Sequence, residues 1–259
     1  MAKMSAYLKV TFEMRRIFEV CCGDVGSVGA AVKGGADRIE LCCALSEGGL
    51  TPSAAMIRMA VKCRVPVNVL IRPRRGDFLY SEEEVDVMAE DIKEAVRLGA
   101  SGVVIGALDQ DGNVDMASMR KMVEAAGNAN VTFHRAFDLC RDPEEALESA
   151  IKLGCDTILT SGLRKNALEG AGMIRRLHEL AKGRISIMAG CGVNPGNAAE
   201  ILQISGADAI HGTASAKIGS EMTYRSPAAC MGAECDEYSR NTTDPDIVAK
   251  LREIVGSFR

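Results

Sequence analysis

The stretch GGADRIEL (34–41) holds, within eight residues, the end of a helix, a short turn and the start of a strand. A glycine commonly ends a helix because it adopts the left-handed backbone conformation without steric cost. Related phrases recur as LGASGVVI (98–105), LGCDTILT (153–160) and SGADAIHG (205–212). The recurrence predicts a repeated unit in which each helix is followed by a buried strand.

Short apolar runs alternate with amphipathic stretches along the whole chain. Residues 81–100 show helical spacing of apolar side chains and open with Ser81 and Glu84, the pattern of a capping box. The segments 142–154 and 194–206 open with Asp-Pro and Asn-Pro, which are typical of helix starts. The predicted strands are 17–21, 38–42, 65–71, 102–106, 130–135, 157–161, 185–190 and 208–212.

About eight strand–helix units in about 240 residues favour an α/β fold, the TIM (β/α)8 barrel, as a single domain. A doubly wound open sheet is the alternative, but no G-x-G-x-x-G follows the first strand. We expect residues 1–13 to be an N-terminal extension and 14–259 to form the barrel. The polar stretch 213–243 is expected to lie over the barrel mouth or at a subunit contact, followed by a helix near 244–257.

Composition narrows the class of protein. The net charge is −4, which argues against a nucleic-acid or anionic-membrane partner, since either would favour a basic face. The apolar runs are far shorter than the roughly 20 residues that span a bilayer, and the start has no apolar secretory core. We therefore expect a cytoplasmic protein. The ten cysteines are then free thiols or metal ligands, and no C-x-x-C motif occurs.

Polar residues gather where the predicted strands end, which is the functional face of a TIM barrel. Side chains alternate along a strand, so Glu19 and Cys21 share one face, as do Glu40 and Cys42. Buried charges need partners, and Arg72, Arg135 and the histidines are available. The candidate catalytic residues, if the protein is an enzyme, are Glu19, Glu40, Arg72, His134, Asp138 and His211.

Two interpretations of these charged residues stay open. They can form a structural ion-pair network inside the barrel, or an acid–base site for a small, possibly phosphorylated metabolite. Glycines after the seventh and eighth strands are typical of loops that bind phosphate, although glycines also serve in turns. The candidate anion-binding residues are Ser161, Gly190, Gly192, Gly212 and Thr213. Cysteines often pack as small apolar residues, and Cys22 and Cys43 should face away from the barrel interior.

Long strings of this sequence resemble the copper homeostasis protein CutC family from about residue 17 onward. They include FEVCCGD (18–24), IRPRRGDFLY (71–80), VTFHRAFD (131–138) and IMAGCGV (187–193). The resemblance implies a TIM barrel, a cytoplasmic protein, a homodimer or higher homo-oligomer, and a link to copper. It also implies that Cys21 and Cys42 hold Cu(I).

The chemistry of the two cysteines is compatible with that implication. Soft thiolates select Cu(I), and neighbouring strands lie about 4.8 Å apart. Inward residues of alternate strands occupy different layers of a TIM barrel, however, so Cys21 and Cys42 need not lie at one height. Glu19 and Glu40 are hard ligands that suit Cu(I) poorly, which keeps the enzyme hypothesis open.

Overall fold

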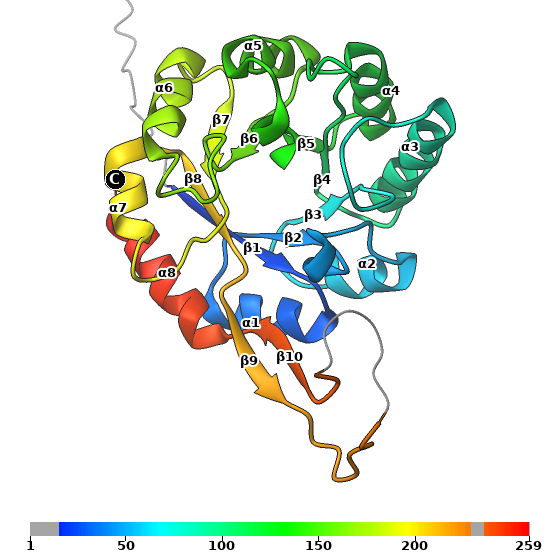
Figure 1. The fold of residues 1–259 in the computed structure, drawn as a ribbon, viewed down its shortest axis with the longest axis vertical. Coiled ribbons are helices and arrows are strands. Elements are labelled where there is room, and N and C mark those ends of the chain that lie inside the picture. The colour runs from blue at the N-terminus through cyan, green and yellow to red at the C-terminus, as the bar shows by residue number, and fades with distance from the viewer. Residues whose placement is uncertain (1–15, 229–235, 259) are drawn as a thin grey trace, which may run out of the picture.

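The computed structural model describes residues 16–228 and 236–258, and the expected extension 1–13 lies outside them. Eight parallel strands form a closed barrel in sequence order, and helices surround it (Figure 1). The strands are β1 (Ile17–Cys22), β2 (Arg38–Leu41), β3 (Val67–Leu70), β4 (Gly102–Ile105), β5 (Asn130–Phe133), β6 (Thr157–Thr160), β7 (Ser186–Ala189) and β8 (Ala209–Gly212). The barrel and all eight predicted strands are thus confirmed.

The outer layer consists of eight α-helices within the described residues. They are α1 (Val25–Gly34), α2 (Ala54–Ala60), α3 (Glu82–Arg97), α4 (Met116–Ala126), α5 (Pro143–Leu153), α6 (Ala171–Ala181), α7 (Ala198–Ser205) and α8 (Pro245–Ser257). Two 3-10 turns, Leu45–Glu47 and Arg135–Leu139, follow β2 and β5. None of the described helices is long and apolar enough to cross a membrane.

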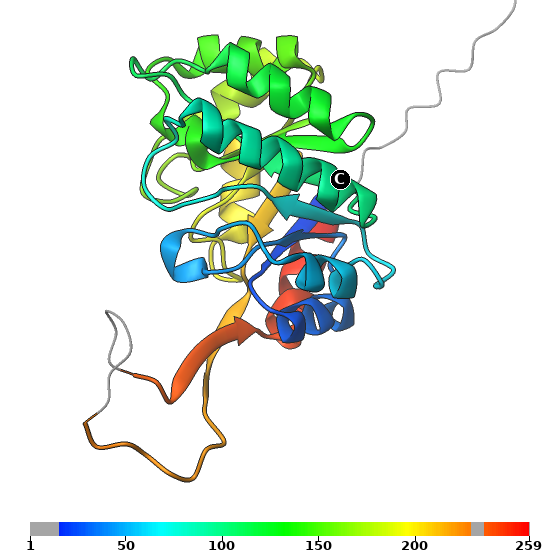
Figure 2. The ribbon, with the colours of Figure 1, turned by 90° about the vertical axis from the view of Figure 1, so that its right-hand side faces the viewer.

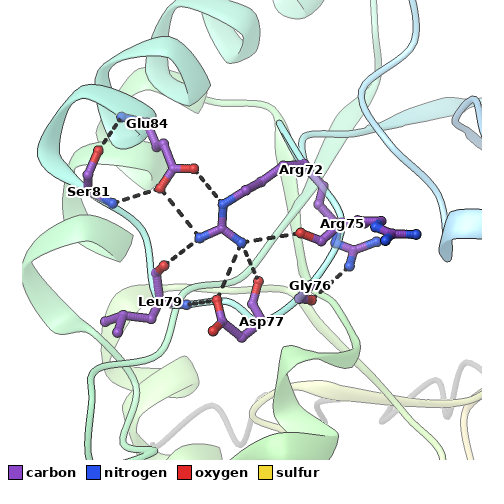
Figure 3. Close-up of polar contacts among 8 residues, drawn as sticks. Arg72, Arg75, Gly76, Asp77, Leu79, Ser81 and Glu84 are labelled. Carbon is purple, nitrogen blue, oxygen red and sulfur yellow. Dashed lines mark hydrogen bonds and ion pairs between the residues drawn. The ribbon is translucent and has the colours of Figure 1, made fainter.

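Local sequence signals explain most helix ends. The predicted capping box of α3 is present: Ser81 Oγ accepts the backbone N–H of Glu84, and the Glu84 carboxylate accepts that of Ser81 (Figure 3). Asp142 caps α5 with Pro143 in its first turn. The prediction for Asn194 is wrong, because α7 begins at Ala198 after the N-cap Asn197, and the Asn194 side chain accepts the N–H of Gly196 instead.

The segment after β8 differs from the expected loop over the mouth. Strands β9 (Ser215–Gly219) and β10 (Ser239–Thr243) form an antiparallel pair that projects away from the barrel beside α1 (Figures 1 and 2). Its base is fixed to α1, because the N–H of Thr243 donates to Ser27 Oγ at 3.2 Å. The described residues beyond Thr213 do not line the cavity of the barrel.

Two apolar layers result from the alternation of side chains along the strands. Phe18, Val20 and Cys22 belong to the large core between the strands and the helices. The odd-numbered residues of β1 therefore point into the barrel. Inside, Cys21, Cys42, Leu70 and Val104 form a small buried cluster. The barrel interior therefore contains this apolar cluster and, on the same faces of the strands, the buried side chains of Glu19 and Glu40.

Candidate functional site

Glu19 is fully buried in the barrel and is held by two cationic partners. Its register partners are Arg38 on β2 and His211 on β8. One carboxylate oxygen, Oε1, lies 2.8 Å from His211 Nδ1, and Arg38 Nε donates to the other. Burial by itself raises the pKa of Glu19, but Arg38 and His211 outweigh that effect and lower it to about 2. Glu19 is therefore an ionised anchor with both oxygens engaged.

Arg38 is the partner that sequence reasoning missed. We expected Arg72, Arg135 or a histidine to pair with the buried glutamates, and only His211 among these does so in the described residues. Arg38 is the first residue of β2 and lies at the amino-terminal end of that strand. It stands two residues before Glu40, so strand alternation places both on the inner face. The two-residue spacing from Glu40 was the sequence signal that could have identified Arg38 as an inward-facing partner.

Glu40 lies between Cys21 and His211. Its Oε1 accepts the Cys21 thiol at 3.3 Å and lies 4.0 Å from His211 Nε2. Its Oε2 is buried and has no hydrogen-bond partner among the described residues. Burial raises the pKa of Glu40, which His211 offsets in part. Burial lowers the pKa of His211, whereas Glu40 and Glu19 together raise it above its usual value.

The thiols of Cys21 and Cys42 meet inside the barrel. Their Sγ atoms are 3.7 Å apart, and both side chains pack with Leu70 and Val104. The hydrogen bond to Cys42, with burial and the nearby Glu40, raises the pKa of Cys21 well above its usual value. The two Sγ atoms are thus in contact, although Cys42 stands two residues beyond Glu40, the register partner of Cys21.

The second cysteine of each pair faces elsewhere, as the alternation predicts. Cys22 is part of the core beneath the helices, and Cys43 donates to the backbone carbonyl of Thr51 at 3.2 Å. The eight cysteines that the structure describes are free thiols. The two Cys-Cys sequences therefore do not form a four-thiolate cluster.

A cavity of about 550 Å³ opens at the carboxyl ends of the strands. This volume lies in the range of small-molecule sites, about 300–1,000 Å³. Cys21, Glu40 and His211 line it, together with Arg72, Phe78 and His134. Cys42 packs against Cys21, is fully buried and is not part of the cavity wall. The cavity thus joins the buried polar cluster to the mouth of the barrel.

His134 is a buried, neutral member of the cavity wall. Its Nδ1 accepts the backbone N–H of Ala136 at 3.1 Å, which places the ring proton on Nε2. Nε2 is buried and has no partner among the described residues. Burial, with the positive charge of Arg72, lowers the pKa of His134 to about 3. The ring also packs against Phe78, with centroids 4.8 Å apart.

Arg72 connects the loops around the mouth. Its Nη1 donates to the carbonyls of Glu47 and Gly49 at 2.8 and 3.0 Å, and its Nη2 donates to that of Gly76 at 3.0 Å. Figure 3 shows Arg72 and Gly76 in the loop before α3. The guanidinium also lies over Phe78, 5.2 Å from the ring centroid. Two of its three nitrogens are thus already used by backbone carbonyls.

Asp138 is engaged in a separate network at the end of β6. Its carboxylate accepts the backbone N–H of Ser161 at 2.9 Å and the hydroxyl of Thr160 at 2.5 Å, and it pairs with Arg135. The Ser161 hydroxyl lies 2.7 Å from the carbonyl of Arg164. Asp138 therefore lies in the cavity wall, but its carboxylate oxygens are already bound by Thr160, Ser161 and Arg135.

The glycine-rich residues after β7 and β8 divide between two environments. Gly192, Gly212 and Thr213 line the cavity. A side chain at Gly190 would come within 2.5 Å of Leu159, so this glycine permits close packing beside His211. Non-glycine residues with positive φ also gather after the barrel strands: Ala44, Leu163, Cys191 and Ala214. Such backbone strain is common around functional sites.

Comparison with known proteins assigns a family. The model of the CutC family matches residues 16–216. A "family protein CutC" of Chromobacterium violaceum is 47% identical over 242 residues, covering 93% of this chain and 98% of the relative. The human "copper homeostasis protein cutC homolog" is 46% identical over 241 residues, covering 92% of this chain and 88% of the relative.

Solved structures agree with the fold. The putative copper homeostasis protein CutC of Streptococcus agalactiae superposes with a TM-score of 0.73 at 32% identity, covering 76% of this chain and 98% of the other. An aldolase, QR15, gives a TM-score of 0.58 at 19% identity, covering 78% of this chain and 92% of the other. The second match supports the barrel architecture alone.

Proposed function

Since the chain belongs to the CutC family, we propose that it binds Cu(I) through Cys21 and Cys42 and serves copper homeostasis. The observation that carries this proposal is the distance of 3.7 Å between the two Sγ atoms. Metal–thiolate bonds of about 2.3 Å allow one ion to contact both sulfurs at such a separation. Soft thiolates also favour Cu(I) over the hard cations.

The surroundings of the two thiols favour the same ion. Leu70 and Val104 pack against them, so the pair has an apolar side, while Cys21 also lines the cavity. The thiol of Cys21 is protonated without metal, because its pKa is raised, and binding of the ion must displace that proton. The carboxylate of Glu19 is occupied by Arg38 and His211, and it supplies no ligand in this proposal.

The test is an anaerobic titration with Cu(I) against a competing chelator. We expect about one equivalent of tightly bound Cu(I), with binding lost in Cys21→Ser and in Cys42→Ser. Cys191→Ser is the matched control, because Cys191 also lies at the mouth but outside the thiol pair. Unchanged binding in both Cys21→Ser and Cys42→Ser would overturn the proposal.

The proposal includes a cytoplasmic location and a homo-oligomer. The cytoplasm keeps thiols reduced, which Cu(I) binding by Cys21 and Cys42 requires. The projecting segment around β9 exposes Ile218, Met222 and Tyr224, an apolar surface suited to a second copy. Light scattering on the full chain tests the oligomer, and a monomer at micromolar concentration would contradict it. Fractionation of cells that express the chain tests the location.

A second candidate function is an enzyme that acts on a small, possibly phosphorylated metabolite. It is favoured by the unpartnered His134 Nε2 and Glu40 Oε2 beside a cavity of metabolite size. In this function Glu40 suits the base better than Glu19, whose oxygens are both engaged. His134 suits a hydrogen-bond donor to a substrate oxygen. Thermal-shift measurements with a metabolite panel test it, and His134→Asn should abolish any shift found.

A further inference from the structure

We propose that Cys21, Glu40 and His211 form a three-ligand site for a divalent cation of the zinc class, open toward the cavity. One ligand atom from each of these residues lies within 4.8 Å of the others. Sulfur, nitrogen and carboxylate oxygen are the donors that Zn²⁺ takes, with bonds of about 2.0–2.3 Å. This site differs from the Cu(I) pair, because it uses Glu40 and His211 in place of Cys42.

The state of Glu40 is the first independent sign of a missing ligand. Its side chain is 6% exposed, yet Oε2 has no hydrogen-bond partner among the described residues. A buried polar atom without a hydrogen-bond partner costs about 1–3 kcal/mol. Such atoms are therefore usually bound by a protein group, a water or an ion. The other oxygen, Oε1, already lies between Cys21 Sγ and His211 Nε2. The carboxylate is therefore placed where an ion would join the three side chains.

The orientation of His211 is the second sign. Its Nδ1 faces Glu19 Oε1 at 2.8 Å, so a proton on Nδ1 leaves the Nε2 lone pair free. Metal-binding histidines generally donate the N–H of their other ring nitrogen to a carboxylate, a backbone carbonyl or water, which fixes the tautomer and the orientation of the ring. Arg38 in turn holds Glu19 from the opposite side. The chain thus supplies both the ligand and the group that orients it.

The position of the three ligands defines what the site can bind. All three line the cavity of about 550 Å³, whereas Cys42 does not. Catalytic zinc sites have three protein ligands and a fourth position for water or substrate, whereas structural sites are closed by four. A cation here would polarise an oxygen of a small molecule in the cavity. The ligand class is therefore a small molecule with a carbonyl, hydroxyl or carboxylate oxygen.

Titration with Co²⁺, a spectroscopic substitute for Zn²⁺, tests the site on the full chain. We expect about one equivalent, with a charge-transfer band from a thiolate, and displacement of Co²⁺ by Zn²⁺. Glu40→Gln and His211→Gln should each weaken binding by at least about tenfold. Glu47→Gln removes a carboxylate from the same end of the barrel and should leave binding unchanged.

The Cu(I) titration separates the two proposals. Cys42→Ser should lose Cu(I) and keep Co²⁺, whereas Glu40→Gln should lose Co²⁺ and keep Cu(I). Retained Cu(I) binding in Glu40→Gln also reports that the barrel is folded. Absence of a thiolate band in the wild-type protein would overturn the three-ligand site, and so would Co²⁺ binding that depends on Cys42. Neither result would affect the Cu(I) pair.

Discussion

Glu19 Oε1 and His211 Nδ1 lie 2.8 Å apart across the junction of β1 and β8, where the barrel closes. The two residues are 192 positions apart in the sequence, yet they are register partners in parallel strands. Closure of the barrel therefore sets the histidine tautomer at the site. Glu19 remains ionised at neutral pH because its pKa is lowered to about 2 by Arg38 and His211 against the effect of burial.

Glu19→Gln should weaken binding of Zn²⁺ by about 10–100-fold without changing its stoichiometry. Loss of carboxylates that orient metal-binding histidines has an effect of this size. The amide has no negative charge, so it holds the His211 proton on Nδ1 less firmly. Competition with a chromophoric chelator measures the affinity, with Glu47→Gln as the control. Equal affinities of Glu19→Gln and wild type would show that Glu19 acts only on the fold.

Arg72→Met should lower the free energy of unfolding by about 2–4 kcal/mol, because hydrogen bonds from a charged donor contribute about 1.5–3 kcal/mol each and are not additive. The variant leaves the carbonyls of Glu47, Gly49 and Gly76 without the guanidinium. Arg75→Met is the matched control. Its side chain is 77% exposed and makes a surface ion pair with Glu47, so a change below about 1 kcal/mol is expected. Urea unfolding measures both, and similar losses would contradict a loop-connecting role.

His134 should make the protein less stable as the pH falls below about 6.5. Burial and Arg72 lower its pKa to about 3 in the folded state, whereas the unfolded chain titrates near 6.5. Between these values the unfolded state binds more protons, so stability decreases with falling pH by about 1.4 kcal/mol per unit. From pH 6.5 to 5 this contribution is about 2 kcal/mol.

His134→Asn removes the titrating group and retains an oxygen that can accept the N–H of Ala136. Its stability should therefore fall less steeply over that range than that of the wild type. Chemical unfolding at pH 7.5, 6.5 and 5 measures the difference. The values at pH 7.5 serve as the internal reference, since His134 is neutral there in both states. Parallel curves for the two proteins would show that His134 is not the group responsible.

The barrel was predictable because each strand carries its own local signals. In the stretch 34–41, Gly35 ends α1 in the left-handed conformation and an apolar run follows, and related junctions recur along the chain. The site was only partly predictable. Strand alternation places Cys21 and Cys42 on inner faces, but their distance depends on the tilt and stagger of the closed barrel. No local pattern encodes that geometry.

The other features that the sequence did not predict also depend on how distant segments pack together. Strand alternation with Glu40 places Arg38 on the inner face, but its pairing with Glu19 emerges only from the register between β1 and β2. The strands β9 and β10 escaped prediction because both faces are mostly exposed, and their polar residues lack apolar alternation. Arg72 is bound to backbone carbonyls, and which carbonyls reach it depends on loops that sequence does not place.

Replacing each of two glycines of α1 by alanine should change the free energy of unfolding in opposite directions. A Cβ at Gly34 would lie 2.6 Å from the backbone oxygen of Pro245 and would also meet Val248, where α8 crosses α1. Gly34→Ala should therefore destabilise by about 1–3 kcal/mol through overpacking.

Gly29 lies in the same helix, is exposed, and has no heavy atom within 4 Å of an added Cβ. Gly29→Ala should stabilise by about 0.5–1 kcal/mol, because alanine loses less backbone entropy in a helix. The pair controls for helix propensity, since both substitutions are made in one helix. Thermal and urea unfolding of the two variants show directly whether each substitution stabilises or destabilises the protein. A stabilising Gly34→Ala would mean that α8 does not pack closely on α1 in solution, and that the last helix is not held against the start of the barrel.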